Sequence, residues 1–167
     1  KLEELLELKR EYAEHIDPDR DPYEVLFEDY EPYIGIDTAE RILTRLREEL
    51  VPLIDDLNDA DLADPFEGAY AEDAQEAVSR DILDALGYDW DRGRLDTSSH
   101  PFTSGNQFDC RITTRFNESD PLGALTSTIH EFGHAQYVLG LPQDAFGTPL
   151  GQDRDLMVHE SQSRFFE

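Results

Sequence analysis

The segment Ser119–Gly140 constrains the fold most, because its sequence SDPLGALTSTIHEFGHAQYVLG predicts a single helix. Asp120 can accept hydrogen bonds from the first free backbone N–H groups, and Pro121 suits the first helical position. Apolar residues then recur at helical spacing until Gly140 ends the pattern. We therefore expect a helix here that packs one apolar side against the rest of the fold.

This predicted helix carries the pattern H-E-x-x-H at His130, Glu131 and His134. Positions four apart lie on one helix face, so both imidazoles can bind one Zn²⁺ at about 2.0–2.1 Å. Glu131 can then reach a metal-bound water. Gly133 costs about 1 kcal/mol relative to Ala inside a helix, which indicates a packing or functional reason for it. We predict a metal site rather than a chance pair of histidines.

A catalytic zinc needs a third protein ligand, and the segment Leu156–Glu167 offers one. It reads as an amphipathic helix with Glu160 at the edge of its apolar side. Glu160 could complete a His₂Glu set, or it could pair with Arg164 on an exposed face, and the composition leaves these alternatives even. His159 points about 100° away from Glu160 on a helix, so we do not expect it to be a fourth ligand.

The rest of the chain is predicted to be mainly helical. Helical patterns cover Lys1–Ile16, residues 22–30, a segment from Asp37 to about Leu57 with Asp37 as N-cap, and Tyr70–Leu86 with Gly87 after it. Pro52 is expected to kink the third of these helices. A polar connection is expected over Asn58–Gly68.

Two short strands are predicted before the H-E-x-x-H helix, over Leu95–Phe102 and Phe108–Phe116. Ser104-Gly105-Asn106 is the turn signal between them, so an antiparallel hairpin is expected. An extended peptide could lie along the edge of such a hairpin.

Composition excludes several functions. The net charge of −25 disfavours a nucleic-acid partner, because phosphates would be repelled. The charge could reflect adaptation to high salt, an acidic interaction face or a disordered region. The acidic residues are spread between apolar positions rather than clustered, which disfavours disorder, and adaptation to high salt is the preferred interpretation. No apolar run reaches the ~18 residues of a membrane span. Cys110 is the only cysteine, so we expect a reducing compartment, the cytoplasm.

Four tracts together resemble the carboxypeptidase Taq family, peptidase family M32. They are His100-Pro101-Phe102-Thr103, Asp109-Cys110-Arg111-Ile112-Thr113, His130–His134 and His159-Glu160-Ser161-Gln162-Ser163. The family carries H-P-F, D-x-R-x-T, H-E-x-x-H and H-E-S-Q tracts in this order. The resemblance implies that His130, His134 and Glu160 are metal ligands, that Glu131 is the general base, and that single residues are removed from peptide C-termini.

We therefore predict a mainly α-helical, zincin-like metallopeptidase segment, with a small antiparallel hairpin or sheet beside the active-site helix. Residues 1–167 are expected to form a single domain of a longer protein whose N- and C-terminal parts are missing, and this segment alone is expected to be inactive. Zn²⁺ is the expected metal, with Co²⁺ as the alternative. The full-length protein could form a homodimer.

Two further residues have open roles. His100 could donate a hydrogen bond to substrate or be structural beside Pro101. Arg111 could bind a substrate carboxylate or pair with Asp109, and the structural role is favoured for it. The H-E-x-x-H pattern alone also permits an endopeptidase or an aminopeptidase. A non-catalytic acidic helical module that binds a partner is the alternative from another class.

Overall fold

A computed structural model describes residues 1–58 and 66–167. The chain divides into two compact units, Lys1–Ala63 and Asp64–Glu167, which are described separately. The predicted connection over Asn58–Gly68 falls mostly on residues 59–65, outside the described part. That all 167 residues form one domain stays a prediction.

The first unit contains three helices, α1 (Leu2–Ile16), α2 (Pro22–Glu28) and α3 (Ile36–Asn58). Ala13 of α1 and Val25 of α2 are buried where these two helices pack together. Asp21 caps α2 by accepting a hydrogen bond from the backbone N–H of Tyr23 at 2.8 Å. The predicted helices are confirmed here, with ends shifted by one or two residues.

Helix α3 differs from its prediction at its start. It begins at Ile36, so Asp37 lies inside the first turn and is not the N-cap. A carboxylate in the first turn still interacts favourably with the positive end of the helix dipole. The helix continues through Pro52, and the predicted kink stays a prediction.

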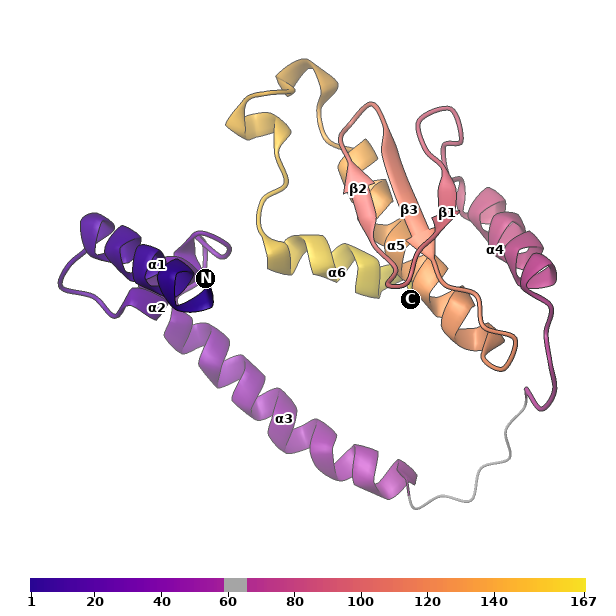
Figure 1. Ribbon diagram of the computed structural model, residues 1–167, viewed down its shortest axis with the longest axis horizontal. Helices are drawn as coiled ribbons and strands as arrows, with labels where there is room; N and C mark the ends of the chain where they lie inside the picture. Colours follow the sequence, from indigo (N-terminus) through magenta and orange to yellow (C-terminus); the bar gives the residue numbers. More distant parts are fainter. Residues whose placement is uncertain (59–65) are drawn as a thin grey trace. The chain divides into compact units, whose positions relative to one another are not determined.

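The second unit is built around helix α5 (Pro121–Leu139), which packs against helices and strands of the unit (Figure 1). These are α4 (Glu72–Leu86), α6 (Leu156–Phe166), and strands β2 (Thr103–Gly105) and β3 (Cys110–Thr114). Two 3₁₀ turns, η1 (Gln143–Ala145) and η2 (Pro149–Gly151), connect α5 to α6. Gly87 ends α4 with φ of 82°, the left-handed conformation expected of a glycine after a helix.

The core of this unit lies between the sheet and α5. Its buried residues are Leu83, Tyr88, Leu95, Cys110, Ile112, Phe132, Ala135 and Leu139. The Tyr88 hydroxyl donates to the carbonyl oxygen of Cys110 at 2.8 Å, so this buried hydroxyl has a hydrogen-bond partner. This core holds α5 firmly against the strands.

None of the described helices is long and apolar enough to cross a membrane.

The sheet corrects the predicted hairpin. It has three strands in the order β1-β3-β2, and β1 (Leu95–Thr97) runs parallel to β3 while β2 runs antiparallel to it. The single strand predicted over Leu95–Phe102 is wrong because the chain leaves the sheet after Thr97 and re-enters it on the other side of β3. The sheet is therefore mixed, although its hairpin is antiparallel.

The turn of the hairpin is also displaced from its prediction. Gly105 belongs to β2, and the reversal lies over residues 106–109. The Asn106 side chain accepts a hydrogen bond from the backbone N–H of Phe108 at 2.9 Å, which closes the turn locally. Gly105 adopts φ of 152° and approaches the backbone of Asp109 so closely that a Cβ would collide with it. Both features keep the strands β2 and β3 in a fixed register.

Candidate metal centre

Helix α5 presents two histidines from neighbouring turns. Its N-cap is the predicted one, because the Asp120 carboxylate accepts a hydrogen bond from the backbone N–H of Gly123 at 2.9 Å. The rings of His130 and His134 lie with their centroids 4.9 Å apart and their planes at 80°. Both side chains are mostly buried, with exposed fractions of 20% and 15%. The spacing of four residues therefore brings two imidazoles to one edge of α5.

Helix α6 brings Glu160 to these rings. Its Oε2 lies 3.3 Å from Nε2 of His134, and its Oε1 lies 3.8 Å from Nε2 of His130. Within the described residues, His130, His134 and Glu160 each offer one ligand atom, and these atoms lie within 4.8 Å of one another. Ligands of a tetrahedral zinc at 2.0–2.1 Å lie about 3.3–3.4 Å apart, and the two distances from Glu160 to the histidines, 3.3 and 3.8 Å, are close to this value.

Glu160 also makes the alternative contact expected from the sequence. Its Oε1 accepts a hydrogen bond from Nε of Arg164 at 3.2 Å. The carboxylate is 48% exposed, and its two oxygens face different partners. The two expectations for Glu160 are thus compatible, because pairing with Arg164 leaves Oε2 directed at His134.

Gly133 explains how α5 and α6 approach so closely. A Cβ at this position would lie 2.6 Å from the carbonyl oxygen of Gln162 and 2.6 Å from Cα of Ser163, which are backbone atoms of α6. No L side chain fits in this space without a shift of one helix. The glycine predicted to have a packing reason therefore allows the Glu160 helix to pack against the histidine helix.

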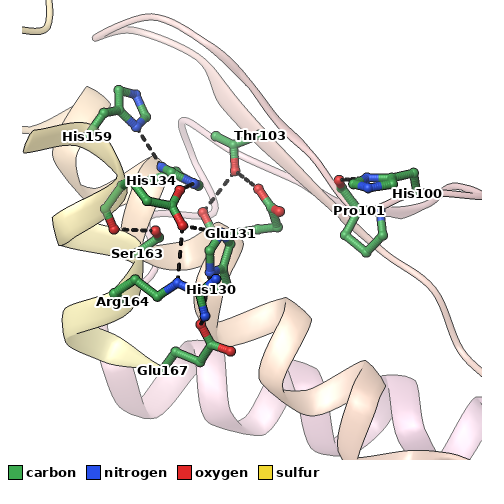
Figure 2. A network of polar contacts seen from close by, with 11 residues as sticks. His100, Pro101, Thr103, His130, Glu131, His134, His159, Ser163, Arg164 and Glu167 are labelled. Atoms are coloured by element: carbon green, nitrogen blue, oxygen red, sulfur yellow. Dashed lines mark hydrogen bonds and ion pairs between the residues drawn. The ribbon is translucent and has the colours of Figure 1, made fainter. Parts of the chain in front are cut away.

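Glu131 lies next to His130 but faces strand β2 (Figure 2). The hydroxyl of Thr103 lies 2.6 Å from Oε2 of Glu131 and 2.9 Å from its backbone carbonyl oxygen. A hydroxyl has one proton to donate, and the carboxylate is the stronger acceptor. Glu131 is 7% exposed. Its carboxylate is therefore held in one orientation at the junction of α5 and the sheet.

His159 of α6 and Glu167, the residue that follows α6, contact the outer nitrogens of the two rings. Nδ1 of His134 lies 2.6 Å from Nδ1 of His159, and Nδ1 of His130 lies 3.1 Å from Oε2 of Glu167. The expectation that His159 is not a ligand is consistent with this geometry, because its contact is on the side of the His134 ring away from Glu160. The sequence did not indicate this contact of His159 with His134, which Figure 2 shows.

Burial lowers the pKa of His134, and the neighbouring rings of His159 and His130 lower it further, against the opposing effect of the Glu160 carboxylate. A lowered pKa keeps the imidazole neutral near pH 7. The neutral ring is the form that can bind a metal ion.

His100 and Arg111 lie outside this cluster. The Nδ1 atom of His100 contacts the carbonyl oxygen of Pro101 at 2.7 Å, and the residue lies apart from the histidine pair (Figure 2). His100 lines a polar pocket of about 310 Å³ together with Arg115, Asn117 and Ser127, among others. On α5 and its N-cap the lining of this pocket extends from Asp120 to Ser127, and a role of His100 toward substrate stays a prediction.

Arg111 makes the structural contact that the sequence favoured. Its Nη2 and Nε donate to the two oxygens of Asp109 at 2.6 and 2.9 Å, and this pairing lowers the pKa of the Asp109 carboxyl. The ion pair is about half exposed on the outside of β3. Two nitrogens of the Arg111 guanidinium are therefore already engaged by Asp109.

Sequence reasoning missed Thr103, His159 and Glu167 as residues around the site. Glu167 was recoverable in part, because a residue seven positions after Glu160 lies on nearly the same helix face. The contact of Thr103 with Glu131 joins a strand to a helix 28 residues further along the chain, and no local period reveals it.

Comparison with known proteins identifies the family of this chain. The carboxypeptidase Taq (M32) metallopeptidase family matches residues 1–167. Carboxypeptidase 1 of Bacillus subtilis is 34% identical over 171 residues, covering 99% of this chain and 34% of that protein. Thermostable carboxypeptidase 1 of Thermus thermophilus is 38% identical over 149 residues, covering 87% of this chain and 29% of that protein.

Solved structures agree as well. The M32 carboxypeptidase from Deinococcus radiodurans R1 superposes with a TM-score of 0.89 at 37% identity, covering 99% of this chain and 34% of that one. Trypanosoma cruzi metallocarboxypeptidase 1 superposes with a TM-score of 0.82 at 32% identity, covering 98% of this chain and 36% of that one. The chain spans about a third of the length of the curated relatives it matches. From its sequence and its fold, the chain belongs to the carboxypeptidase Taq (M32) metallopeptidase family.

Proposed function

We propose that this chain is the metal-binding part of a zinc-dependent metallocarboxypeptidase that releases single residues from peptide C-termini. The observation that carries the proposal is the convergence of His130, His134 and Glu160, whose ligand atoms lie within 4.8 Å of one another. Two imidazoles and one carboxylate that leave a fourth position open are a donor set of catalytic zinc enzymes. The names of the relatives as carboxypeptidases supply the reaction.

In this proposal, His130, His134 and Glu160 hold the ion, with Co²⁺ as an alternative to Zn²⁺. A bound zinc ion supplies Lewis acidity, which activates water near pH 7 and polarises a carbonyl group. Glu131 accepts the proton of the attacking water and passes it to the leaving amine. The Thr103 hydroxyl holds Oε2 of Glu131, so the second carboxylate oxygen is available for the proton transfer.

The strand order supports a path for the substrate. Among the described strands, β2 lies at one edge of the sheet, and it carries the Thr103 that contacts Glu131. An extended peptide that adds to this edge would pass beside the general base. A peptide is therefore the proposed partner, whereas the charge of −25 disfavours nucleic acid.

We further propose a cytoplasmic, salt-adapted protein. Cys110 is the only cysteine of the chain and is fully buried, as suits a reducing compartment. The excess of 39 acidic over 14 basic residues suits high ionic strength, where counterions screen the repulsion. That the full-length protein forms a homodimer stays a prediction.

The test of the activity uses the full-length protein and paired peptides that differ only in a free or an amidated C-terminus. A carboxypeptidase releases the last residue of the free peptide and spares the amide. Cleavage of both peptides at an internal bond would show an endopeptidase, and release from the N-terminus an aminopeptidase. The variant Glu131→Gln should retain zinc and lose nearly all hydrolysis, because an amide cannot accept the proton. Zinc binding without hydrolysis of any peptide would favour the non-catalytic module.

A further inference from the structure

We infer that His159 and Glu167 are positioning residues that fix the two histidine rings of α5 with both Nε2 atoms directed at the metal. The inference rests on the proposed metal site and extends it from the three ligands to the groups that orient them. A free imidazole has two nitrogens and can turn either one toward an ion. A partner on one nitrogen decides which of them is available.

His130 is oriented by a carboxylate. Its Nδ1 lies 3.1 Å from Oε2 of Glu167, while its Nε2 lies 3.8 Å from Oε1 of Glu160. Ionised Glu167 can only accept a hydrogen bond, so Nδ1 must carry the proton and donate it. The lone pair is then on Nε2, the nitrogen that faces Glu160. A carboxylate in this position also makes the imidazole a stronger donor to a metal ion.

His134 is oriented by a second imidazole. Its Nδ1 lies 2.6 Å from Nδ1 of His159, while its Nε2 lies 3.3 Å from Oε2 of Glu160. If Nε2 of His134 is to bind a metal, its Nδ1 carries the proton and donates it to His159. The proton of His159 is then on its own Nε2. Tyr137 packs edge-on against the His159 ring, with centroids 5.2 Å apart, and restricts its rotation.

Helix α6 and its C-cap supply the third ligand and both positioning groups, since Glu160 and His159 lie in the helix and Glu167 caps its end. Its N-cap Asp155 is buried and accepts a hydrogen bond from the backbone N–H of Val158 at 2.7 Å, which fixes where the helix begins. Arg164 donates to Glu160 at 3.2 Å and to Glu167 at 2.8 Å, so it couples the ligand carboxylate to the positioning carboxylate. The positions of all these groups therefore depend on one helix register.

The two positioning residues are distinct from ligands. Each contacts an Nδ1 atom, on the side of the ring away from Glu160, and neither belongs to the cluster of convergent ligand atoms found in the described residues. Loss of either side chain should weaken metal binding without abolishing it. Outer partners of this kind change metal affinity by about 10- to 100-fold when they are removed.

The test measures zinc affinity of the full-length protein by competition with a chromophoric chelator. We expect Glu167→Ala and His159→Phe each to weaken zinc binding by roughly 10- to 100-fold. Glu167→Gln should recover part of the loss, because its amide oxygen still accepts the Nδ1 proton. Glu76→Ala is the matched control for the carboxylate, since Glu76 pairs with Arg80 on an exposed face of α4. His15→Ala is the control for the imidazole.

A second readout separates positioning from folding. Co²⁺ bound to the protein should show visible absorption bands that shift in Glu167→Ala and His159→Phe but not in the controls, while circular dichroism confirms that every variant keeps its helix content. Zinc affinity and Co²⁺ spectra equal to wild type in both variants would overturn the inference and leave the metal site intact. Loss of all zinc in Glu167→Ala, with the fold preserved, would make Glu167 a ligand and also overturn it. A wild-type protein that binds no zinc contradicts the proposed function itself.

Discussion

At the residue scale, the orientation of the Glu131 carboxylate depends on one hydroxyl group. Thr103 is 2.6 Å from Oε2 of this carboxylate, which is almost fully buried. Thr103→Val keeps the shape of the side chain and removes the donor. Hydrogen bonds to charged groups contribute about 1.5–3 kcal/mol, so kcat should fall roughly 10- to 150-fold with little change in KM. Thr103→Ser should restore kcat because it keeps the hydroxyl. A Thr103→Val enzyme with wild-type kcat would show that the contact does not position the base.

Cys110 provides a pH-dependent prediction at the same scale. Burial in the core raises the pKa of its thiol to about 11 from the ordinary 9.0. The folded state therefore favours the protonated thiol, and its contribution to stability is present below about pH 9 and lost as the pH rises toward 11. At pH 8 a thiol reagent should label the protein in urea but leave the native protein unlabelled. Rapid stoichiometric labelling without urea would mean that Cys110 is accessible.

The residues of the site differ in how far the sequence predicted them. His130, Glu131 and His134 are spaced within one helix, so a local period places them on it before any tertiary structure is known. His159 could not be placed in this way. Its expected direction was taken relative to Glu160 on the same helix, whereas its actual neighbour depends on the crossing of α5 and α6, which is set by packing between the helices.

At the element scale, the contact of α5 with α6 depends on Gly133. Ala is a better helix former than Gly by about 1 kcal/mol, yet its Cβ would lie 2.6 Å from backbone atoms of α6. Overpacking of this kind costs about 1–3 kcal/mol, so Gly133→Ala should lower the free energy of unfolding and weaken zinc binding as Glu160 moves away. Gly35→Ala is the control, because the space around Gly35 is open. Urea unfolding and zinc competition of both variants check these two effects. A Gly133→Ala protein whose free energy of unfolding is unchanged or higher would show that the helices are not this close.

The sheet shows what the sequence cannot predict about elements. Helix α6 was predicted from its apolar period with the observed first residue, Leu156, and α5 with its observed N-cap. The path from β1 to β2 left no such signal. Alternation along a strand identifies an extended segment, but which edge of β3 it joins is decided by long-range backbone pairing. One strand over Leu95–Phe102 was therefore expected, whereas the structure has β1 over Leu95–Thr97 and β2 over Thr103–Gly105, on opposite edges of β3.

At the scale of the whole molecule, the charge of −25 is the property most open to measurement. The chain has 39 acidic residues and 14 lysines and arginines, so the negative charges repel one another and few can be offset by basic side chains. Screening of this repulsion should stabilise the fold, so the melting temperature should rise steadily from dilute buffer to molar KCl. A melting temperature that is flat or falls over this range would contradict adaptation to high salt.

The central claim is that His130, His134 and Glu160 bind one metal ion, and zinc stoichiometry of the purified full-length protein tests it most directly. After saturation with zinc and removal of excess, elemental analysis should give one ion per chain. His130→Ala and His134→Ala should reduce this value to near zero, and Glu160→Gln should weaken retention because it replaces an anionic ligand with a neutral amide. The control His100→Ala should retain one ion. Zinc retained at one per chain in His130→Ala and His134→Ala would contradict the claim, as would a wild-type protein that retains none.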